Sequence, residues 1–343
     1  MIQQYISIRQ GGGGSVSVAV SDASPDVGDV ITITATATGF TPTNYLFYAQ
    51  QGGQLLQIGE QSGNVINWTV SIIGTFKIFV NATDSPIGAF NAGGLDVTST
   101  AVIVTTNIQL WQDPFRSNVV PPTYPDISGF GRDGTMNNTP LFVAGTLFPN
   151  GGGYTEFNGV DQSIGSIGTV SDFSFIQNTL QFTIGTWVRV TNLTGRNPVV
   201  ASTSSSANKG FVFYSLDTSS AFGGIAKGIA IQITRGVGGG NQIFVRSVNN
   251  IITTVEWNYI AITMNGVNTG QIYLNGVAIP TSNGGSSWVN PTGDSTRVLS
   301  VGRITSESLF FTGRIGPVQI YDRALTALEV QQNFETDRYR YGI

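Results

Sequence analysis

Short runs in which apolar and polar residues alternate recur along the N-terminal third of the chain. Val16, Val18 and Val20 alternate with small residues, and further runs occupy residues 30–33, 45–49, 65–72, 75–81 and 98–104. Alternation with a period of two is typical of β-strands that bury one face. About seven short strands separated by turn residues predict a β-sandwich over residues 15–106.

A short segment precedes this region and is followed by four consecutive glycines, Gly11 to Gly14. Because glycine is conformationally permissive, we expect residues 1–14 to form an N-terminal arm and a flexible linker. The arm carries residues of high strand propensity, namely Ile2, Tyr5, Ile6 and Ile8. We predict that it anchors the protein in an assembly by adding a strand to a neighbour. A free tail is the alternative.

The C-terminal region contains one strand followed by one helix. In residues 314–321, Val318 and Ile320 lie on one face of the predicted strand, and Gln319 and Tyr321 lie on the other. Thr326 and Glu329 fit a capping box, which marks the start of a helix. Leu325, Leu328 and Phe334 are the residues that this helix is expected to bury. The chain is therefore predicted to be all-β, with one short C-terminal helix.

A series of motifs in residues 107–343 resembles laminin G-like domains of the concanavalin A-like jelly-roll superfamily. They occur in the family's order: LWQD (110–113), YPDISG (124–129), FNGVD (157–161), FTIGTWV (182–188), WNYIAIT (257–263) and IYLNGVA (272–278). The resemblance implies a jelly roll over residues 107–343. Residues 15–106 resemble bacterial and phage immunoglobulin-like modules, which implies an immunoglobulin-like β-sandwich. Asn275-Gly276 also predicts a two-residue hairpin.

Composition excludes several classes of function. The chain has 16 basic and 20 acidic residues in 343, and its net charge of −4 argues against nucleic-acid binding. Because no apolar run approaches the ~20 residues of a membrane span, we expect no membrane partner. Cysteine and histidine are absent, which removes disulfides and the commonest general base. Charged residues make up only 10% of the chain, which favours a homo-oligomer or another packed assembly.

An enzymatic role has little support in the sequence, although the same jelly roll also occurs in glucanases. Such enzymes need two carboxylates that flank the scissile bond. The only candidate spacing is Glu156 to Asp161, and an amide, Asn158, stands between them. Other carboxylates, such as Glu256, stand alone and are expected to be solvated surface charges. We therefore predict no catalytic residues and no enzyme activity.

The resemblance also raises the question of calcium, because laminin G-like domains often bind Ca²⁺ near two of their strands. Asn158 and Gly316-Pro317 stand where the family has acidic residues. Ca²⁺ prefers six to eight oxygen ligands with negative charge among them. We therefore expect no metal site and no cofactor, with at most weak calcium binding through Asp161.

One loop suggests a contact with a ligand or a partner. Trp288 lies in residues 281–294, with Asn283 and Asn290 nearby. An exposed tryptophan beside amides is typical of sugar sites, and tryptophan is also enriched at protein–protein interfaces. Both alternatives stay open at this point.

The last residues, 333–343, resemble the endings of laminin G-like proteins in tailed bacteriophages. The resemblance implies a non-enzymatic virion structural protein, assembled in the host cytoplasm with other virion proteins of the capsid or tail. We favour a capsid decoration or head-fibre protein exposed on the particle surface. The alternatives are a tail fibre or baseplate adhesin that binds a host surface glycan, and a secreted bacterial carbohydrate-binding lectin. Residues 1–10 lack the features of a signal peptide, which favours the virion.

Overall fold

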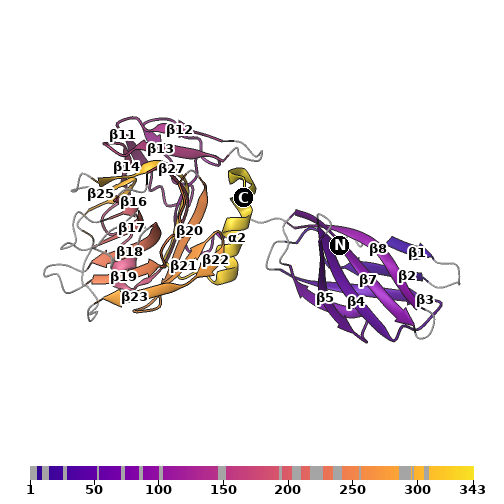
Figure 1. Cartoon of the computed structure of the whole chain (residues 1–343). Coiled ribbons are helices and arrows are strands. Elements are labelled where there is room, and N and C mark those ends of the chain that lie inside the picture. The colour runs from indigo at the N-terminus through magenta and orange to yellow at the C-terminus, as the bar shows by residue number, and fades with distance from the viewer. Residues whose placement is uncertain are drawn as a thin grey trace. The chain divides into compact units, whose positions relative to one another are not determined.

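The computed structural model divides the chain into two compact units, Met1–Ile103 and Val104–Ile343 (Figure 1). The structure describes residues 6–9, 15–25, 29–51, 54–70, 74–84, 88–99, 103–145, 152–192, 195–202, 210–216, 227–234, 242–254, 256–285, 295, 297–304 and 309–343. Each unit has its own apolar core. Within the described ranges, no helix is long and apolar enough to cross a membrane.

The described residues of the first unit form two four-stranded antiparallel sheets. One sheet has the order β1 (Ile6–Arg9), β2 (Ser15–Val20), β3 (Val30–Thr38) and β6 (Val65–Thr69). The other has the order β5 (Gln54–Gln61), β4 (Asn44–Gln51), β7 (Gly74–Asp84) and β8 (Gly88–Ser99). Alternate residues such as Val16 and Val18 on β2 and Phe76 and Ile78 on β7 are buried in one shared cluster. The sheets therefore face each other across a core, as predicted from the alternation.

The N-terminal arm is not independent of this unit. Ile6–Arg9 forms β1, which pairs with β2 of the same chain in the register Ile6↔Val18 to Arg9↔Ser15. The expectation that the glycines separate the arm from the sandwich is therefore wrong for these four residues. The physical reason is that β2 offers backbone hydrogen-bond partners within the same chain, so β1 needs no neighbouring copy to pair with. Ile2 and Tyr5 lie outside the described residues, as do the side chains of Ile6 and Ile8.

The last strand of the first unit differs from its prediction. A strand was expected over residues 98–104, whereas β8 spans Gly88–Ser99 and residues 103–105 are not in a strand. Pairing with β7 along most of its length sets the position of β8. Backbone pairing of this kind outweighs the low strand propensity of the glycines and asparagine in residues 88–94.

The second unit contains two large sheets within the residues described. The nine-stranded sheet has the order β10 (Thr123–Tyr124), β11 (Gly134–Asn137), β14 (Ser163–Ile167), β24 (Leu299–Val301), β16 (Arg196–Ala201), β17 (Gly210–Leu216), β18 (Gly228–Thr234), β19 (Gln242–Ser247) and β23 (Thr281–Gly285). The eight-stranded sheet has the order β12 (Leu141–Val143), β13 (Tyr154–Asn158), β27 (Thr312–Tyr321), β15 (Gln181–Val190), β20 (Asn258–Asn265), β21 (Gln271–Leu274) and β22 (Val277–Ile279), and β9 (Ile108–Gln112) also pairs with β27. β25 (Arg303–Ile304) and β26 (Leu309–Phe310) form a separate antiparallel pair.

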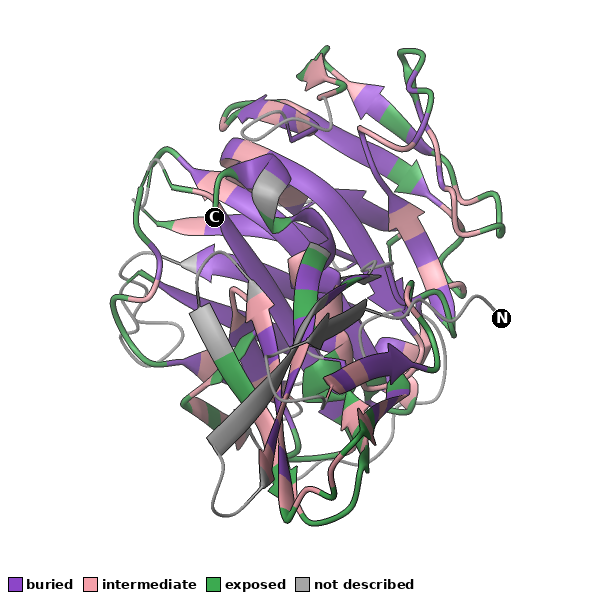
Figure 2. Cartoon of the chain, turned by 90° about the vertical axis from the view of Figure 1, so that its right-hand side faces the viewer, coloured by how far each residue is buried: buried purple, intermediate pink, exposed green. Residues whose placement is uncertain are grey.

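The two sheets of the second unit enclose the main core, which includes Phe182, Phe213 and Ile320. Figure 2 shows buried positions along the strands and exposed ones in the connecting loops. β15 and β20 are buried at nearly every position, although a half-solvated strand would alternate. Both faces of these strands must therefore be covered.

The second cover comes from the C-terminal helix α2 (Ala327–Asp337) and the 3₁₀ turn η2 (Arg338–Tyr341). Figure 1 shows α2 beside β20, β21 and β22. Aromatic residues of the eight-stranded sheet, including Trp187 and Tyr259, share an apolar cluster with Phe334 and Tyr341 from the C-terminal segment. A short helix α1 (Phe175–Asn178) precedes β15.

The predicted features of this C-terminal region are confirmed with one exception. Val318 and Ile320 face the main core, and Tyr321 faces the helix. The capping box is present, with the Glu329 backbone N–H donating to the Thr326 hydroxyl at 3.2 Å and the Thr326 N–H donating to the Glu329 carboxylate at 2.8 Å. Leu328, however, is 40% exposed, because α2 buries Val330 rather than this position.

Candidate functional site

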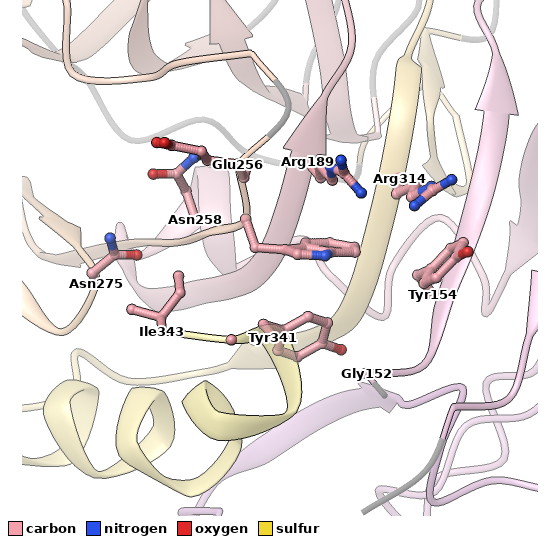
Figure 3. Close-up of a pocket in the computed structure, with 11 residues that line it drawn as sticks. Gly152, Tyr154, Arg189, Glu256, Asn258, Asn275, Arg314, Tyr341 and Ile343 are labelled. Carbon is pink, nitrogen blue, oxygen red and sulfur yellow. Dashed lines mark hydrogen bonds between the residues drawn. The ribbon is translucent and has the colours of Figure 1, made fainter. Parts of the chain in front are cut away.

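A hollow of about 560 Å³ lies on the helix-covered face of the eight-stranded sheet, beside η2 (Figure 3). Strands β13, β15 and β27, the residues that precede β20 and the C-terminal segment all contribute to it. Its lining residues are Gly152, Tyr154, Arg189, Glu256, Trp257, Asn258, Asn275, Arg314, Tyr341, Gly342 and Ile343. Its volume is within the ~300–1,000 Å³ typical of small-molecule sites.

Two arginines from neighbouring strands form one side of the pocket. Arg189 on β15 and Arg314 on β27 are directly opposite each other in the antiparallel ladder. Glu156 on β13 is the partner of Arg314 on its other side, and its carboxylate accepts a hydrogen bond from Arg314 Nε at 3.2 Å. The Arg314 guanidinium also lies 4.6 Å from the centre of the Tyr154 ring. The sheet register therefore fixes the position of both guanidinium groups.

Aromatic rings provide the apolar part of the pocket. Trp257, just before β20, is partly buried, and its ring centre lies 4.7 Å from that of Tyr341 and 5.8 Å from that of Tyr154. Tyr341 in turn stacks on Trp187 at 4.3 Å. Trp257 is therefore supported from two sides, which lowers the entropy cost of using its surface for binding.

Two amide side chains in the pocket are held in place by backbone contacts. Asn275 Oδ1 accepts a hydrogen bond from the Tyr259 N–H at 2.9 Å, and Asn258 Nδ2 donates to the Glu256 carbonyl at 3.3 Å. Asn275 has φ 50° and Gly276 has φ 77°, and they form the predicted two-residue turn between β21 and β22. This left-handed turn is what brings the Asn275 side chain to the rim of the pocket.

Glycines allow Tyr341 to approach the sheet closely. A Cβ on Gly152 would lie 2.6 Å from the Cδ1 atom of the Tyr341 ring, and a Cβ on Gly316 would lie 2.6 Å from its hydroxyl oxygen. The hydroxyl donates to the Gly153 carbonyl at 2.8 Å. Burial raises the pKa of Tyr341 well above its ordinary value, so the phenol stays neutral at physiological pH.

A buried ion network, formed by Asp113, Arg116, Asp337 and Arg340, holds the C-terminal segment in place. The side chain of Arg340 is fully buried and contacts Asp337 at 2.7 Å and Asp113 at 3.4 Å. Arg116 contacts the same two carboxylates, Asp113 at 2.6 Å and Asp337 at 2.9 Å. Although burial lowers the pKa of Arg340, the charge of Asp337 raises it above the ordinary value. The network therefore joins the end of β9 to η2, next to Tyr341.

The pocket has an acidic side chain as well as its two arginines. Among the described lining residues, Glu256 is the one carboxylate side chain, and it accepts a hydrogen bond from the Thr253 hydroxyl at 2.6 Å. It is exposed, as expected for a solvated surface charge, and it also lies at the pocket. Of the predicted pair, Glu156 binds Arg314, and Asp161 accepts a hydrogen bond from Asn158 Nδ2 at 2.9 Å in the turn after β13.

The region where the resemblance would place calcium is built differently here. Asn158 Oδ1 accepts hydrogen bonds from the Val160 and Asp161 N–H groups at 2.9 and 3.2 Å, so it caps its own turn. Gly316 leaves the space that the Tyr341 hydroxyl approaches. An acidic side chain at position 316 would collide with Tyr341 in this arrangement. Within the part of the chain that the structure describes, no group of three or more acidic side chains could hold a metal ion.

Of the three residues proposed for ligand contact from sequence, Asn283 alone is described, and it does not line this pocket. Trp288 and Asn290 lie outside the described residues. Asn283 was placed in a loop, but residues 281–285 form β23, which pairs with β19. Asn283 exchanges two hydrogen bonds of 2.9 Å with the backbone of Gly270, so its amide joins two segments of the fold.

Sequence reasoning missed Arg189, Arg314, Tyr154 and Tyr341 as site residues. Trp257 was noticed only as part of a strand motif. One signal could have identified the two arginines. The chain has only 16 basic residues, and Arg189 and Arg314 both occur within strands. A charged residue in a strand is expected on the face that points away from the core. Their pairing depends on the register of β15 and β27, which alternation alone does not fix.

A family model matches part of the second unit, and several solved structures are similar to the chain. Residues 161–331 match the family model of the concanavalin A-like lectin/glucanases superfamily. Similar solved structures include the binding domain of Paraclostridial Mosquitocidal Protein 1, with 18% identity over 67% of this chain and 52% of that one and a TM-score of 0.46. The matched part thus spans about half the length of that structure.

Two further structures have comparable scores. Domain 4 of AbnA, a GH43 extracellular arabinanase from Geobacillus stearothermophilus in complex with arabinotriose, shares 15% identity over 66% of this chain and 98% of that one, with a TM-score of 0.47. Trypanosoma rangeli sialidase shares 11% identity over 98% of this chain and 53% of that one, with a TM-score of 0.46. No curated protein matches the sequence.

The second unit has a concanavalin A-like jelly-roll fold with two facing antiparallel sheets, and residues 161–331 within it match the laminin G-like family model. The predicted fold class, all-β with this jelly roll and a short C-terminal helix, is confirmed. Part of the pocket, including Tyr154 and Tyr341, lies outside the matched residues. The pocket therefore depends on segments that flank the family's shared region.

Proposed function

We propose that the protein is a non-enzymatic structural protein of a tailed-bacteriophage virion, exposed on the particle surface as a capsid decoration or head-fibre protein. The first unit acts as an immunoglobulin-like docking block, and the jelly roll faces outward. The observation that supports the non-enzymatic part is the chemistry of the pocket, whose described lining combines two arginines and aromatic rings with one carboxylate side chain. The phage assignment is supported by the resemblance of residues 333–343 to phage proteins.

The pairing of β1 with β2 changes how the N-terminal arm would take part in assembly. Because β1 pairs with β2, any strand exchange with a neighbour must first release this pairing. Exchange of an identical strand between copies conserves the hydrogen bonds, so it needs no new interface chemistry. Residues 1–10 therefore stay the proposed assembly element, with a homo-oligomer or another virion protein as partner.

Localisation on particles tests the proposal. We expect the full chain to sediment with phage particles in a density gradient, and antibodies against the jelly roll to label the head in electron micrographs. Label on the tail would instead support the tail fibre or baseplate adhesin. Full recovery of the protein in the soluble fraction, with none on particles, would contradict a virion role and favour a secreted lectin.

We expect no glycosidase activity from the full chain. Hydrolysis requires an acid and a base or nucleophile on opposite sides of the scissile bond, and the pocket supplies one carboxylate beside a hydroxyl donor. The measurement is reducing-sugar release from neutral and acidic polysaccharides as a function of protein concentration. Release that rises with protein and disappears in both Glu256→Gln and Glu156→Gln would show that a catalytic pair exists after all.

The adhesin alternative is favoured by one specific observation. The pocket combines a supported tryptophan, two guanidinium groups and two oriented amides. Such a combination of apolar and polar groups is typical of sites that recognise a small polar ligand. A capsid decoration protein with such a pocket could also bind a host glycan. The decoration and adhesin roles therefore differ in where the protein lies on the particle, and they share the same ligand-binding pocket.

A further inference from the structure

Two arginines form a cross-strand pair at the pocket, which places two like charges side by side. Like charges directly opposite each other destabilise an antiparallel sheet. Arg189 and Arg314 occupy such a pair, and Glu156 stands beside Arg314 in the same row of the sheet. These three side chains carry one net positive charge between them. An anion in the pocket would offset the repulsion between the two guanidinium groups.

The orientation of Arg314 fits a planar anion. Glu156 accepts from Nε, and within the described residues no protein acceptor contacts the two terminal nitrogens of Arg314. Its side chain is 27% exposed. A guanidinium group presents paired N–H donors that match a carboxylate in a bidentate geometry. Figure 3 shows Arg189 and Arg314 on the same side of the pocket, opposite Tyr341.

The remaining lining residues suit a sugar ring that carries such an anion. Trp257 offers an apolar surface, held between Tyr154 and Tyr341, for the C–H face of a pyranose. Asn275 uses Oδ1 for the Tyr259 N–H, which leaves Nδ2 as a donor. Asn258 uses Nδ2 for the Glu256 carbonyl, which leaves Oδ1 as an acceptor. A donor and an acceptor together complement vicinal hydroxyl groups.

We propose that this pocket binds a carboxylate-bearing sugar residue, of the uronic-acid class, with its carboxylate on Arg314 and Arg189 and its ring on Trp257. This inference rests on the proposed non-enzymatic role, but it does not depend on where the protein sits on a particle. Glu256 lies at the same pocket and repels anions, so the carboxylate is placed at the arginine side, next to Tyr154.

Calorimetric titration of the full chain with methyl glucuronoside and with methyl glucoside tests the inference. The two sugars differ only in the carboxylate, so their affinity ratio isolates its contribution. We expect the glucuronoside to bind at least about tenfold more tightly at low salt, as for a charge-assisted bidentate contact. Equal affinities, or no binding of the glucuronoside, would overturn the inference.

Three variants locate the effect. Arg314→Gln is expected to remove the preference for the glucuronoside, and Arg314→Lys to retain part of it, because lysine keeps the charge but not the paired donors. Arg297→Gln is the matched control, since Arg297 is an exposed arginine of the same unit that does not line the pocket. Melting curves establish that each variant is folded.

The outcomes separate this inference from the proposed function. An undiminished preference in Arg314→Gln would overturn the assignment of the pocket while leaving the virion proposal intact. Cleavage of the glucuronoside during the titration would instead contradict the non-enzymatic role. Absence of the protein from particles would contradict the virion role and leave the sugar assignment unaffected.

Discussion

Replacement of Arg340 by methionine is expected to lower the free energy of unfolding of the second unit by about 3–5 kcal/mol, because it breaks a buried ion network from one side. The Arg340 side chain is fully buried between Asp337 and Asp113, whose side chains are 1% and 0% exposed. Without Arg340, two buried carboxylates would share the single charge of Arg116, which is itself 26% exposed. Arg340 also stacks on Phe115 at 4.3 Å, a contact that methionine only partly replaces.

The measurement is urea unfolding of the full chain, followed by tryptophan fluorescence, since four of the five tryptophans belong to the second unit and only Trp68 belongs to the first. Arg338→Met is the control within the same 3₁₀ turn. Arg338 contacts Glu335 at 2.5 Å, but its side chain is 46% exposed, so its loss should cost less than about 1 kcal/mol. Similar unfolding midpoints for the two variants would show that the buried network contributes little to stability.

The features that were predicted from sequence are those that local interactions determine. The capping box of Thr326 and Glu329 involves residues three apart, and the Asn275-Gly276 turn involves two neighbours. Alternation correctly placed Val318 and Ile320 in the core, because successive side chains on a strand point to opposite faces of the sheet. The jelly roll was accessible because several such local motifs occur in the order of a known family.

The pocket could not be predicted in the same way, because its parts are distant in sequence. Tyr154, Arg189, Trp257, Arg314 and Tyr341 come together only through sheet register and the docking of η2. A register shift by one residue would place Arg189 in the core, so the site exists only when the whole sheet is formed.

Two errors of assignment, in β8 and β23, had one cause, since backbone pairing outweighed local propensity in both. The glycines and asparagine in residues 88–94 are typical of turns, yet this segment belongs to β8. Asn283 was assigned to a loop for the same reason, yet it lies in β23. Leu328 was expected to be buried because it is apolar, but the face of α2 that packs on the sheet contains Val330 and Phe334 instead.

Removal of the Phe334 ring is expected to have a comparable effect on stability, and it should also reach the pocket. Phe334 is 6% exposed and stacks on Trp187 at 5.6 Å, and its ring also lies 6.1 Å from Tyr259. Truncation of a buried phenylalanine to alanine costs about 3–5 kcal/mol, because it leaves a cavity as well as losing apolar burial. We therefore expect Phe334→Ala to lower the free energy of unfolding of the second unit by this amount.

The matched control is Leu328→Ala, on the same helix but 40% exposed, which should change stability by no more than about 0.5 kcal/mol. The pair also tests whether α2 organises the pocket. Phe334 holds the helix on the sheet, and Tyr341 follows directly in η2, stacked on the same Trp187. Under conditions in which both variants are folded, Phe334→Ala should therefore weaken binding of methyl glucuronoside more than Leu328→Ala does. Equal affinities in the two variants would show that the pocket keeps its shape without this anchor, and that Tyr341 is held by Gly153 and the buried ion network alone.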